Sequence, residues 1–282
     1  MINSRKGKLY IVPTPIGNLQ DITYRAVEVL KTVDLIGAED TRKSAVLLSH
    51  YKVETPTFSY HKFNERSRVE KILEKLSSGK NIAIISDAGT PGISDPAQII
   101  IREVLNSGME VETLPGPAAF LPALVSSGLA TDRFQFIGFL PEKKSDKVKL
   151  LSDLLHYEGT LIFYEAPHRL VKFIAELLEV LGNRKVVIAR EISKIYETYV
   201  RTSFSEFVDH PEIVNIKGEF VVIVEGYIKA EIGQEELEKI IRSKLSKGTV
   251  LKKMVKEIAD ETGLNKNRIY EIALQLKRAE KD

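Results

Sequence analysis

The sequence predicts an α/β protein with two α/β domains, the first built on a mainly parallel sheet and the second on a mixed sheet, followed by a small helical domain. Short apolar runs rich in β-branched residues alternate with amphipathic segments in the first half, as in parallel strands joined by helices. The second half repeats this alternation less regularly, and the last fifty residues show only helical patterns. We place the domains at residues 1–128, 129–229 and 230–282.

The composition is that of an ordinary globular protein. Of the 282 residues, 43% are hydrophobic and 28% are charged. The absence of cysteine excludes disulfides, thiolate metal sites and a cysteine nucleophile. No apolar run approaches the ~20 residues of a membrane span, and the basic N-terminus lacks the apolar core of a signal peptide. We therefore expect a cytoplasmic protein that makes no membrane contact.

The first domain is expected to contain five strands, most of them followed by a helix. The predicted strands are 9–12, 33–38, 57–60, 81–85 and 109–114, and the predicted helices are 24–31, 43–51, 97–106 and 120–127. Asp21 or Thr23 is expected to cap the first helix, and Asp40 or Thr41 the second, because short oxygen-bearing side chains favour that position.

The loop Ser86–Pro96 carries the clearest functional signal. Its eleven residues, rich in Gly, Pro, Ser, Thr and Asp, are more than a strand-to-helix turn requires. Gly89 and Gly92 allow positive φ and the close approach of a ligand. The end of the loop, Ser94-Asp95-Pro96, is expected to start the next helix with a capping side chain and a proline. Because open α/β sheets bind ligands at the carboxyl ends of their strands, we favour a ligand-binding loop over a structural one.

Three other strand ends also carry signals. Pro13–Asn18 occupies the place of a dinucleotide-binding turn, but one Gly and two Pro do not form the G-x-G-x-x-G fingerprint. Glu39–Arg42 offers two acids and an Arg that could hold a substrate or orient a base, although Asp40 or Thr41 could equally serve only as a cap. Pro115–Ala119 has small residues that admit either a ligand or neighbouring backbone.

The third strand opens into His61–Arg66. Cationic, aromatic and amide side chains in one loop are what a loop that grips a nucleotide would contain. A single histidine is more often structural, and no His-x₃-His pair occurs among the five histidines, so we expect no metal site.

The second domain is expected to form a separate sheet from its own strands. These are 134–137, 160–164, 185–189, 196–202 and 218–224, the last of them as a closing hairpin strand, with helices ending near 157 and 181. Several charged residues could form a wall that faces the first domain, or could be solvated surface charges. They are Arg169, Arg190, Glu191, Lys194 and Glu219.

The C-terminal segment is basic and helical. Helices are predicted at 231–241, 250–261 and 266–277, with a break at Gly248. The spacing of Ala259, Gly263 and Ile269 is that of a helix-turn-helix, with Asn265 as a cap. Residues 239–278 carry eleven Lys or Arg against four Asp or Glu, a net charge of +7, whereas residues 1–238 carry −4. Such segregated charge favours a phosphate-contacting surface, and a solvated face or a dimer cap is the alternative.

Together the loops resemble the ribosomal RNA small-subunit methyltransferase I family, the RNA-acting branch of the tetrapyrrole methylases. The resemblance rests on 13-PTPIGNL-19, 38-AEDTR-42, 59-SYH-61, residues 86–96, 115-PGP-117, 138-GFLP-141 and 164-YEAPHR-169, in collinear order. It implies S-adenosylmethionine as methyl donor, bound in the cleft between two α/β domains. It also implies a homodimer, and 2′-O-methylation of a cytidine in the decoding region of small-subunit ribosomal RNA, either as free RNA or in the assembled subunit.

The resemblance also implies site residues. The turn Asp87, Ala88, Gly89 and Thr90 matches the segment that holds the donor, Ala118 and Ala119 match a second donor-contacting turn, and Tyr164, Glu165 and Ala166 match the interdomain strand end. The first loop departs from the glycine-rich turn of the small-molecule enzymes, which suggests a reshaped acceptor mouth. Pro15 and Gly17 are its candidate donor contacts.

The chemistry implied is in-line transfer of a methyl group from sulfonium to oxygen, for which alignment alone can contribute ~7–11 kcal/mol. A ribose hydroxyl is a weak nucleophile, so a general base would help. Glu39, Asp40, Asp95, Glu165 and Glu191 lie near strand ends and could serve. We favour the cluster Glu39, Asp40 and Arg42, with His61 as a further candidate, and expect Lys266 and Arg268 nearest to RNA.

Two other classes of function fit parts of the sequence. A methylase of a tetrapyrrole or another small molecule would use the same fold, because fold does not fix substrate. The basic C-terminal segment and the first loop argue against it. A non-enzymatic nucleic-acid-binding regulator would use only the helix-turn-helix and would leave the elaborate strand-end loops without a purpose.

Overall fold

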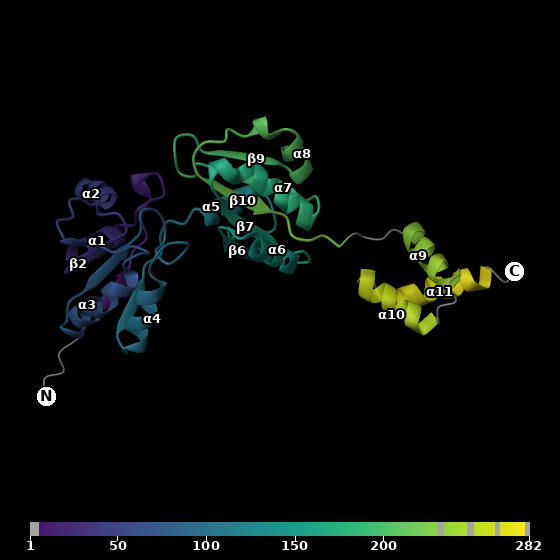
Figure 1. The fold of residues 1–282 in the computed structure, drawn as a ribbon, viewed down its shortest axis with the longest axis horizontal. Helices are drawn as coiled ribbons and strands as arrows, with labels where there is room; N and C mark the ends of the chain where they lie inside the picture. Colours follow the sequence, from purple (N-terminus) through teal and green to yellow (C-terminus); the bar gives the residue numbers. More distant parts are fainter. Residues whose placement is uncertain (1–5, 230–233, 247–250, 263–265, 280–282) are drawn as a thin grey trace. The chain divides into compact units, whose positions relative to one another are not determined.

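The computed structural model describes residues 6–229, 234–246, 251–262 and 266–279. The chain forms two compact units, Met1–Gly226 and Tyr227–Asp282, which are considered separately (Figure 1). The predicted positions Gly248, Gly263 and Asn265 lie outside the described residues. Within the described part of the chain, no helix combines the length and the apolar character needed to span a bilayer.

The first sheet has five strands, all parallel, as the sequence predicts. They are β1 (Lys8–Ile11), β2 (Leu35–Ala38), β3 (Thr57–Ser59), β4 (Ile82–Ile85) and β5 (Glu110–Thr113), in the order β3-β2-β4-β1-β5. All four residues of the central β4 are buried, which is why its sequence is an uninterrupted apolar run.

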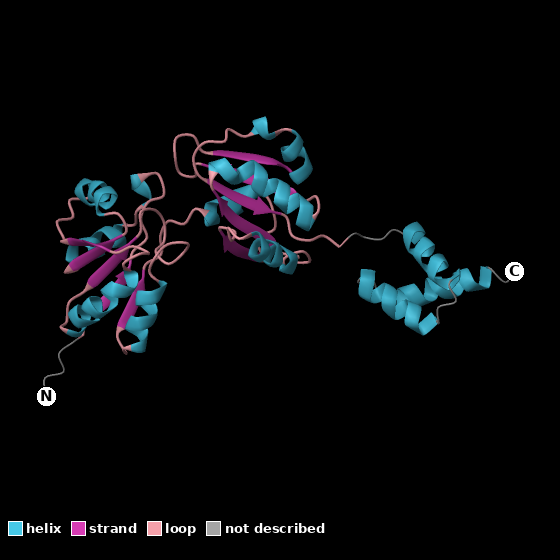
Figure 2. Ribbon diagram, viewed as in Figure 1, coloured by secondary structure: helices cyan, strands magenta, loops and turns pink. Residues whose placement is uncertain are grey.

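Helices cover both faces of this sheet (Figure 2). They are α1 (Tyr24–Thr32), α2 (Thr41–His50), α3 (Glu65–Ser77) and α4 (Gln98–Asn106). Apolar residues of α1 and α2 pack on one face, and those of α3 and α4 on the other. Thr23 caps α1 and Asp40 caps α2, each accepting a hydrogen bond from a backbone N–H of the first turn. We predicted no element over α3, although its apolar residues Val69, Ile72, Leu73 and Leu76 recur at helical spacing.

The start of α4 corrects the predicted cap. Ser94-Asp95-Pro96 does not begin this helix, and Ala97, at its capping position, provides no side-chain hydrogen bond. The buried carboxylate of Glu65, at the start of α3, instead accepts a hydrogen bond from the backbone N–H of Ile99 at 3.2 Å. A negative charge near a helix N-terminus is stabilising. Glu65 of α3 therefore provides the cap that Ser94 or Asp95 was expected to provide for α4.

The second sheet is mixed, as predicted. Its strands are β6 (Phe134–Gly138), β7 (Thr160–Glu165), β8 (Lys185–Arg190), β9 (Thr198–Ser203) and β10 (Phe220–Val224), in the order β6-β7-β10-β8-β9. Only β6 and β7 pair in parallel. The prediction of a closing hairpin strand at residues 218–224 is wrong, because β10 lies between β7 and β8. All five residues of β10 are buried, as a central strand requires.

The two faces of the second sheet are covered differently. Helices α6 (Lys144–Asp153), α7 (Leu170–Leu181) and α8 (Phe204–Asp209) pack on one face. The other face is covered by α5 (Phe120–Ser127), whose Ala123 and Leu124 are buried against β8 and β10. By these contacts α5 belongs with the second sheet, although the boundary we place at residue 128 follows it.

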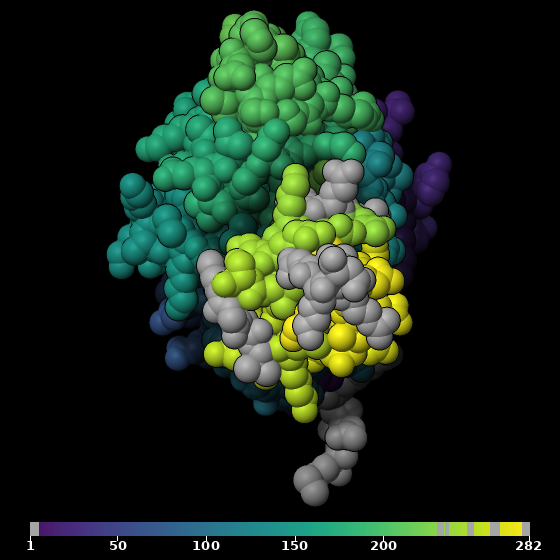
Figure 3. All heavy atoms as spheres, turned by 90° about the vertical axis from the view of Figure 1, so that its right-hand side faces the viewer, coloured from purple at the N-terminus to yellow at the C-terminus, as the bar shows by residue number. Residues whose placement is uncertain are grey.

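The C-terminal unit contains three helices, α9 (Gln234–Ser246), α10 (Leu251–Thr262) and α11 (Lys266–Ala279). They pack against one another in the space-filling view (Figure 3, yellow-green to yellow). Their shared core includes Leu237, Ile241, Met254, Ile258 and Ile269, all fully buried. The side chains of Lys266 and Arg268 are exposed at the start of α11.

Candidate active site

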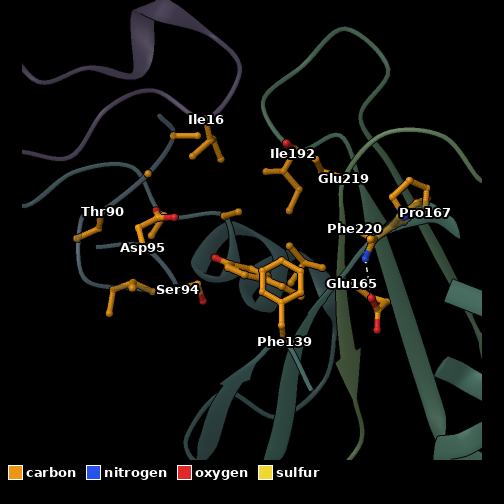
Figure 4. A pocket seen from close by; sticks show the side chains of 18 residues that line it. Ile16, Thr90, Ser94, Asp95, Phe139, Glu165, Pro167, Ile192, Glu219 and Phe220 are labelled. Carbon is orange, nitrogen blue, oxygen red and sulfur yellow. Dashed lines mark hydrogen bonds between the residues drawn. The ribbon is translucent and has the colours of Figure 1, made fainter. Parts of the chain in front are cut away.

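A cavity of about 310 Å³ lies where loops of the first sheet meet the second sheet (Figure 4). The first domain contributes loops that follow β1, β4 and β5, and the second contributes residues at the ends of β6, β7, β8 and β10. The walls are mostly apolar, with a few convergent polar groups, which is the usual character of a small-molecule site. The carboxyl ends of the parallel strands therefore form one side of this cavity, which is where open α/β sheets bind ligands.

Eight of the eleven predicted donor-binding residues line this cavity. They are Ala88, Gly89, Thr90, Ala118, Ala119, Tyr164, Glu165 and Ala166. Pro15, Gly17 and Asp87 do not line it, although Ile16, between the first two, does. The structure thus brings together three loops that lie far apart in the sequence.

Hydrogen bonds hold these loops to one another. Thr14 and Gly89 exchange two backbone hydrogen bonds of 2.9 Å, which join the loop after β1 to the loop after β4. The Thr90 hydroxyl donates to the carbonyl of Pro117 at 2.9 Å, which adds the loop after β5. Gly89 has φ +81°, a conformation that side chains with a Cβ rarely adopt. The site is therefore preorganised on the side of the first domain.

Aromatic rings form part of the cavity wall in the second domain. The Tyr164 ring lies 5.0 Å from Phe136 and 5.7 Å from Phe139, both in edge-to-face contact. Burial raises the pKa of Tyr164 to about 12, so its hydroxyl stays protonated. Phe139, half exposed in the cavity wall (Figure 4), was not among our predicted site residues.

Asp95 is the carboxylate that the first domain presents to the cavity (Figure 4). Burial raises its pKa to about 7, and the nearby negative charges of Glu39 and Asp87 add to that shift. A carboxyl group that titrates near neutral pH can hold or release a proton under working conditions. We predicted chiefly a helix cap here, and the structure places this side chain in the cavity wall instead.

The cluster favoured as catalytic, Glu39, Asp40 and Arg42, does not line the cavity. Asp40 caps α2 and forms an ion pair of 2.8 Å with Arg42, which holds the pKa of Asp40 well below its usual range. The Arg42 side chain is 88% exposed. These residues flank the site and do not form its wall.

Asp87 fastens that cluster to the loop Ser86–Pro96. Its carboxylate accepts hydrogen bonds from the backbone N–H of Asp40 at 3.0 Å and from the Lys43 ammonium at 2.8 Å. Its own backbone N–H donates to Glu39 at 3.4 Å. Asp87 therefore fixes the position of the loop that carries Ala88 and Gly89.

His61 also lies outside the cavity wall. Its Nε2 atom is 3.2 Å from the amide nitrogen of Asn64, and its Nδ1 atom is buried without a hydrogen-bond partner in the described part of the chain. Among the described residues no group of His, Asp or Glu is arranged to bind a metal ion.

Glu165 provides a buried carboxylate on the side of the second domain. Its Oε1 atom accepts a hydrogen bond from the backbone N–H of Ala166 at 2.8 Å and lies 3.3 Å from Nε of Arg169. Its Oε2 atom is buried and has no partner within the described structure. This carboxylate is therefore enclosed by protein, and Arg169 offsets its charge.

The predicted charged wall forms in part. Lys194 pairs with Glu191 at 3.0 Å and with Glu219 at 2.9 Å. The same loop contacts the first domain, since the Ser193 hydroxyl hydrogen-bonds to Asp21 and the Lys194 side chain packs against Gly17. Arg169 and Arg190 are not part of this group: Arg169 pairs with Glu165, and Arg190 donates to the carbonyls of Lys217 and Tyr196.

Solved structures identify the fold class. A structure titled methyltransferase CobJ has a TM-score of 0.60 at 19% identity, covering 80% of this chain and 97% of that one. Uroporphyrin-III C-methyl transferase of Thermus thermophilus, complexed with S-adenyl homocysteine, has a TM-score of 0.55 at 20% identity, covering 78% and 97%. The model of the tetrapyrrole (corrin/porphyrin) methylases matches residues 8–208.

Curated relatives are more closely similar. A protein of Synechocystis is 43% identical over 274 residues, covering 96% of this chain and 98% of the relative. A protein of Bacillus subtilis is 42% identical over 275 residues, covering 95% and 94%. Both are named ribosomal RNA small subunit methyltransferase I. This chain belongs to that family, within the tetrapyrrole methylases.

Proposed function

We propose that this protein transfers a methyl group from S-adenosylmethionine to small-subunit ribosomal RNA, and that the acceptor is the 2′-hydroxyl of a cytidine in the decoding region. The observation that carries the proposal is the cavity formed by the loops after β1, β4 and β5, with Asp95 in its wall. The names of the relatives give the class of reaction, and the resemblance of the loop motifs gives the cytidine and its 2′-oxygen.

The cavity suits a cationic nucleoside donor. Its apolar walls fit a nucleoside, and Gly89, Ala118 and Ala119 keep backbone within reach of one. The carboxylate of Asp95, when ionised, suits a ligand that carries positive charge. S-adenosylmethionine, when bound, supplies a methyl group made electrophilic by its attachment to a sulfonium. We assign its binding to the eight predicted residues that line the cavity.

Asp95 is our candidate general base. In its ionised form the carboxylate would accept the proton of the ribose hydroxyl as the hydroxyl oxygen bonds to the methyl carbon. The bond from that carbon to the sulfonium would break at the same time, leaving its electron pair on sulfur as a neutral thioether. A positioned base of this kind contributes about 10²- to 10⁴-fold to the rate. Asp95 takes the place of Glu39, Asp40, Arg42 and His61 in this role because it alone of the five lines the cavity.

The other charged residues support this chemistry from outside the cavity. Glu39 and Asp87 raise the pKa of Asp95, which makes its carboxylate a stronger base near neutral pH. The Lys43 ammonium pairs with Asp87, and Arg42 is exposed beside it, at the end of β2. We assign these two cations to the side from which RNA approaches.

We further propose that the protein acts in the cytoplasm as a homodimer. The cytoplasm follows from a ribosomal substrate, and the homodimer from the resemblance. The exposed Leu121 and Val125, one turn apart on α5, would suit a protein contact. Light scattering of the purified protein measures its oligomeric state.

The C-terminal unit is our candidate for binding RNA phosphates. Replacing both Lys266 and Arg268 with Ala is expected to weaken RNA binding and to reduce the slope of log affinity against log salt by about 0.7–0.9 for each phosphate that the variant no longer neutralises. Donor affinity should not change. The matched control replaces Lys75 and Lys80, two exposed lysines in the first unit, with Ala, and it should leave the salt slope unchanged. RNA affinity at three salt concentrations, with the oligomeric state, tests this assignment. An unchanged slope in a folded double variant would contradict it.

One assay tests the proposed function as a whole. Tritiated S-adenosylmethionine is incubated with small ribosomal subunits, with naked ribosomal RNA and with a precorrin-like acceptor. Label is expected in the RNA of one of the first two, at a ribose 2′-oxygen. Label only in the precorrin-like acceptor would replace the proposal with a small-molecule methylase. RNA binding without transfer to any of the three acceptors would favour the non-enzymatic regulator.

A further inference from the structure

The loop between β3 and α3 presents an aromatic ring to solvent. Phe63 is 95% exposed. A single exposed apolar side chain is common on protein surfaces, so its exposure alone implies no function. The order of its loop, its place at the edge of the first sheet and the charges beside it are what distinguish Phe63.

Side-chain hydrogen bonds order this loop. The amide oxygen of Asn64 accepts from the backbone N–H of His61 at 2.8 Å, and the amide nitrogen donates to the carbonyl of Ser59 at 3.2 Å. The His61 ring lies 6.1 Å from the Phe63 ring at an interplanar angle of 66°. The ring of Phe63 is therefore carried by a preformed turn, which lowers the entropy lost when a ligand binds to it.

A buried contact joins this turn to the donor-binding loop. The Glu65 carboxylate accepts hydrogen bonds from the Tyr60 hydroxyl at 2.6 Å and from the backbone N–H of Ile99 at 3.2 Å. Ile99 lies in the first turn of α4, three residues after the loop Ser86–Pro96. β3 also pairs in parallel with β2, so both strands end at the same edge of the sheet. Phe63 therefore lies at the carboxyl end of the sheet, the same end from which the donor-binding loops start.

Two exposed cations lie close to Phe63 in the sequence. Lys62 and Arg66, on either side of it, are exposed, and the structure gives neither an ion pair among the described residues. Two more exposed cations, Arg42 and Lys43, follow the neighbouring strand β2, where they pair with Asp40 and Asp87. An aromatic face among cations is the typical means of binding single-stranded nucleic acid, in which the ring stacks on a base and the cations attract phosphates. Bases inside a duplex have no free face to offer.

We propose that Phe63 is a stacking platform for an unpaired base of the RNA substrate that flanks the methylated nucleotide. This inference rests on the proposed function. Stacking there fixes one nucleotide at the sheet edge, and Lys62 and Arg66 contact the phosphates on either side of it. Phe63 contributes to binding of the RNA acceptor and does not contact the methyl donor, which binds in the cavity.

Three substitutions at Phe63 separate stacking from other roles. Stacking on an aromatic side chain is lost in Phe63→Ala and Phe63→Leu and is kept in Phe63→Trp. We expect the first two to raise the KM for RNA by between about 5-fold and 100-fold, the range measured for loss of one stacked base. We expect Phe63→Trp to keep the wild-type KM, and the dissociation constant of the donor, measured by calorimetry, to be unchanged in all three. Leu105→Ala, which shortens an exposed apolar side chain on α4, is the control.

Each other result overturns the platform. A wild-type KM in Phe63→Leu would show that an aromatic face is not needed. Equal losses of RNA and donor affinity, or a lower melting temperature, would show a structural role. Dissociation of a homodimer in Phe63→Ala would place Phe63 in a contact between subunits.

A binding measurement keeps this test independent of catalysis. The chain contains no tryptophan, so Phe63→Trp carries a single indole. Quenching of its fluorescence by a single-stranded oligoribonucleotide, and not by a duplex of the same sequence, is expected. Absence of quenching by the single-stranded oligoribonucleotide would overturn the stacking platform. Quenching by this oligoribonucleotide, in a protein that transfers no methyl group to RNA, would overturn only the proposed function.

Discussion

Replacing Asp95 with Asn is expected to lower kcat for methyl transfer by about 10²- to 10⁴-fold, because an amide cannot accept the proton of the attacking hydroxyl. The substitution keeps the size of the side chain in the cavity wall. Single-turnover kinetics with saturating donor and RNA measure the chemical step, and calorimetry measures donor affinity. A loss of donor affinity as large as the loss of rate would assign Asp95 to donor binding.

The pH dependence identifies the base more directly. Asp95 accepts a proton only when ionised, so the wild-type kcat/KM, which reports the ionisations of the free enzyme, should rise with pH through about 7. This is the pKa to which burial and its acidic neighbours raise this carboxyl group. Asp95→Asn should lose this rise. Glu39→Gln removes one of the neighbouring charges and should move the rise to lower pH while preserving it. Persistence of the same rise in Asp95→Asn would show that another group is the base.

Replacing Gly89 with Val is expected to reduce donor affinity at least a hundredfold. Gly89 has φ +81°, and a Cβ placed there would lie 3.5 Å from the side chain of Ile16, at the wall of the cavity. A β-branched side chain would both disfavour this conformation and occupy space meant for the ligand. Calorimetric titration with S-adenosylmethionine measures the effect.

A matched glycine separates the two causes. Gly108 also has positive φ, +65°, but a Cβ there would meet nothing within 4 Å, and Gly108 does not line the cavity. Gly108→Val should therefore lower stability and leave donor affinity near that of the wild type. If both variants lose the same donor affinity, backbone strain explains the loss and Gly89 has no special place in the site.

Much of the fold can be predicted from the sequence because local patterns determine it. Apolar runs such as residues 82–85 and 220–224 are buried on both faces of their sheets, so each predicts a strand by itself. The position of residues 220–224 within the sheet does not follow from the run. Strand order depends on contacts between segments distant in sequence, and β10 pairs with both β7 and β8. Helix α3 has an amphipathic pattern and could have been predicted, but its many charged residues resemble those of a solvated loop.

Residues of the cavity wall could be predicted where small side chains at strand ends carry the signal. Gly89, Ala118 and Ala119 are small residues at strand ends, and all three line the cavity. Asp95 was harder, since an Asp before a Pro at the start of a helix is also a normal capping residue. Asp95 lies in the cavity wall, and it is Glu65, thirty residues earlier, that accepts a hydrogen bond from the N-terminus of α4. The residues next to Asp95 or Glu65 in the sequence do not indicate that Glu65, and not Asp95, caps α4.

The raised pKa of Asp95 also has a consequence for folding. In the unfolded chain this carboxyl group ionises with its ordinary pKa of 3.8, whereas in the folded protein it holds its proton up to about pH 7. The folded state therefore binds more protons over this range, and the free energy of unfolding falls as pH rises through it. The ionised carboxylate that the proposed reaction requires is thus formed at the expense of stability. A cationic ligand in the cavity would recover that stability, so donor binding and folding are thermodynamically linked through one carboxyl group.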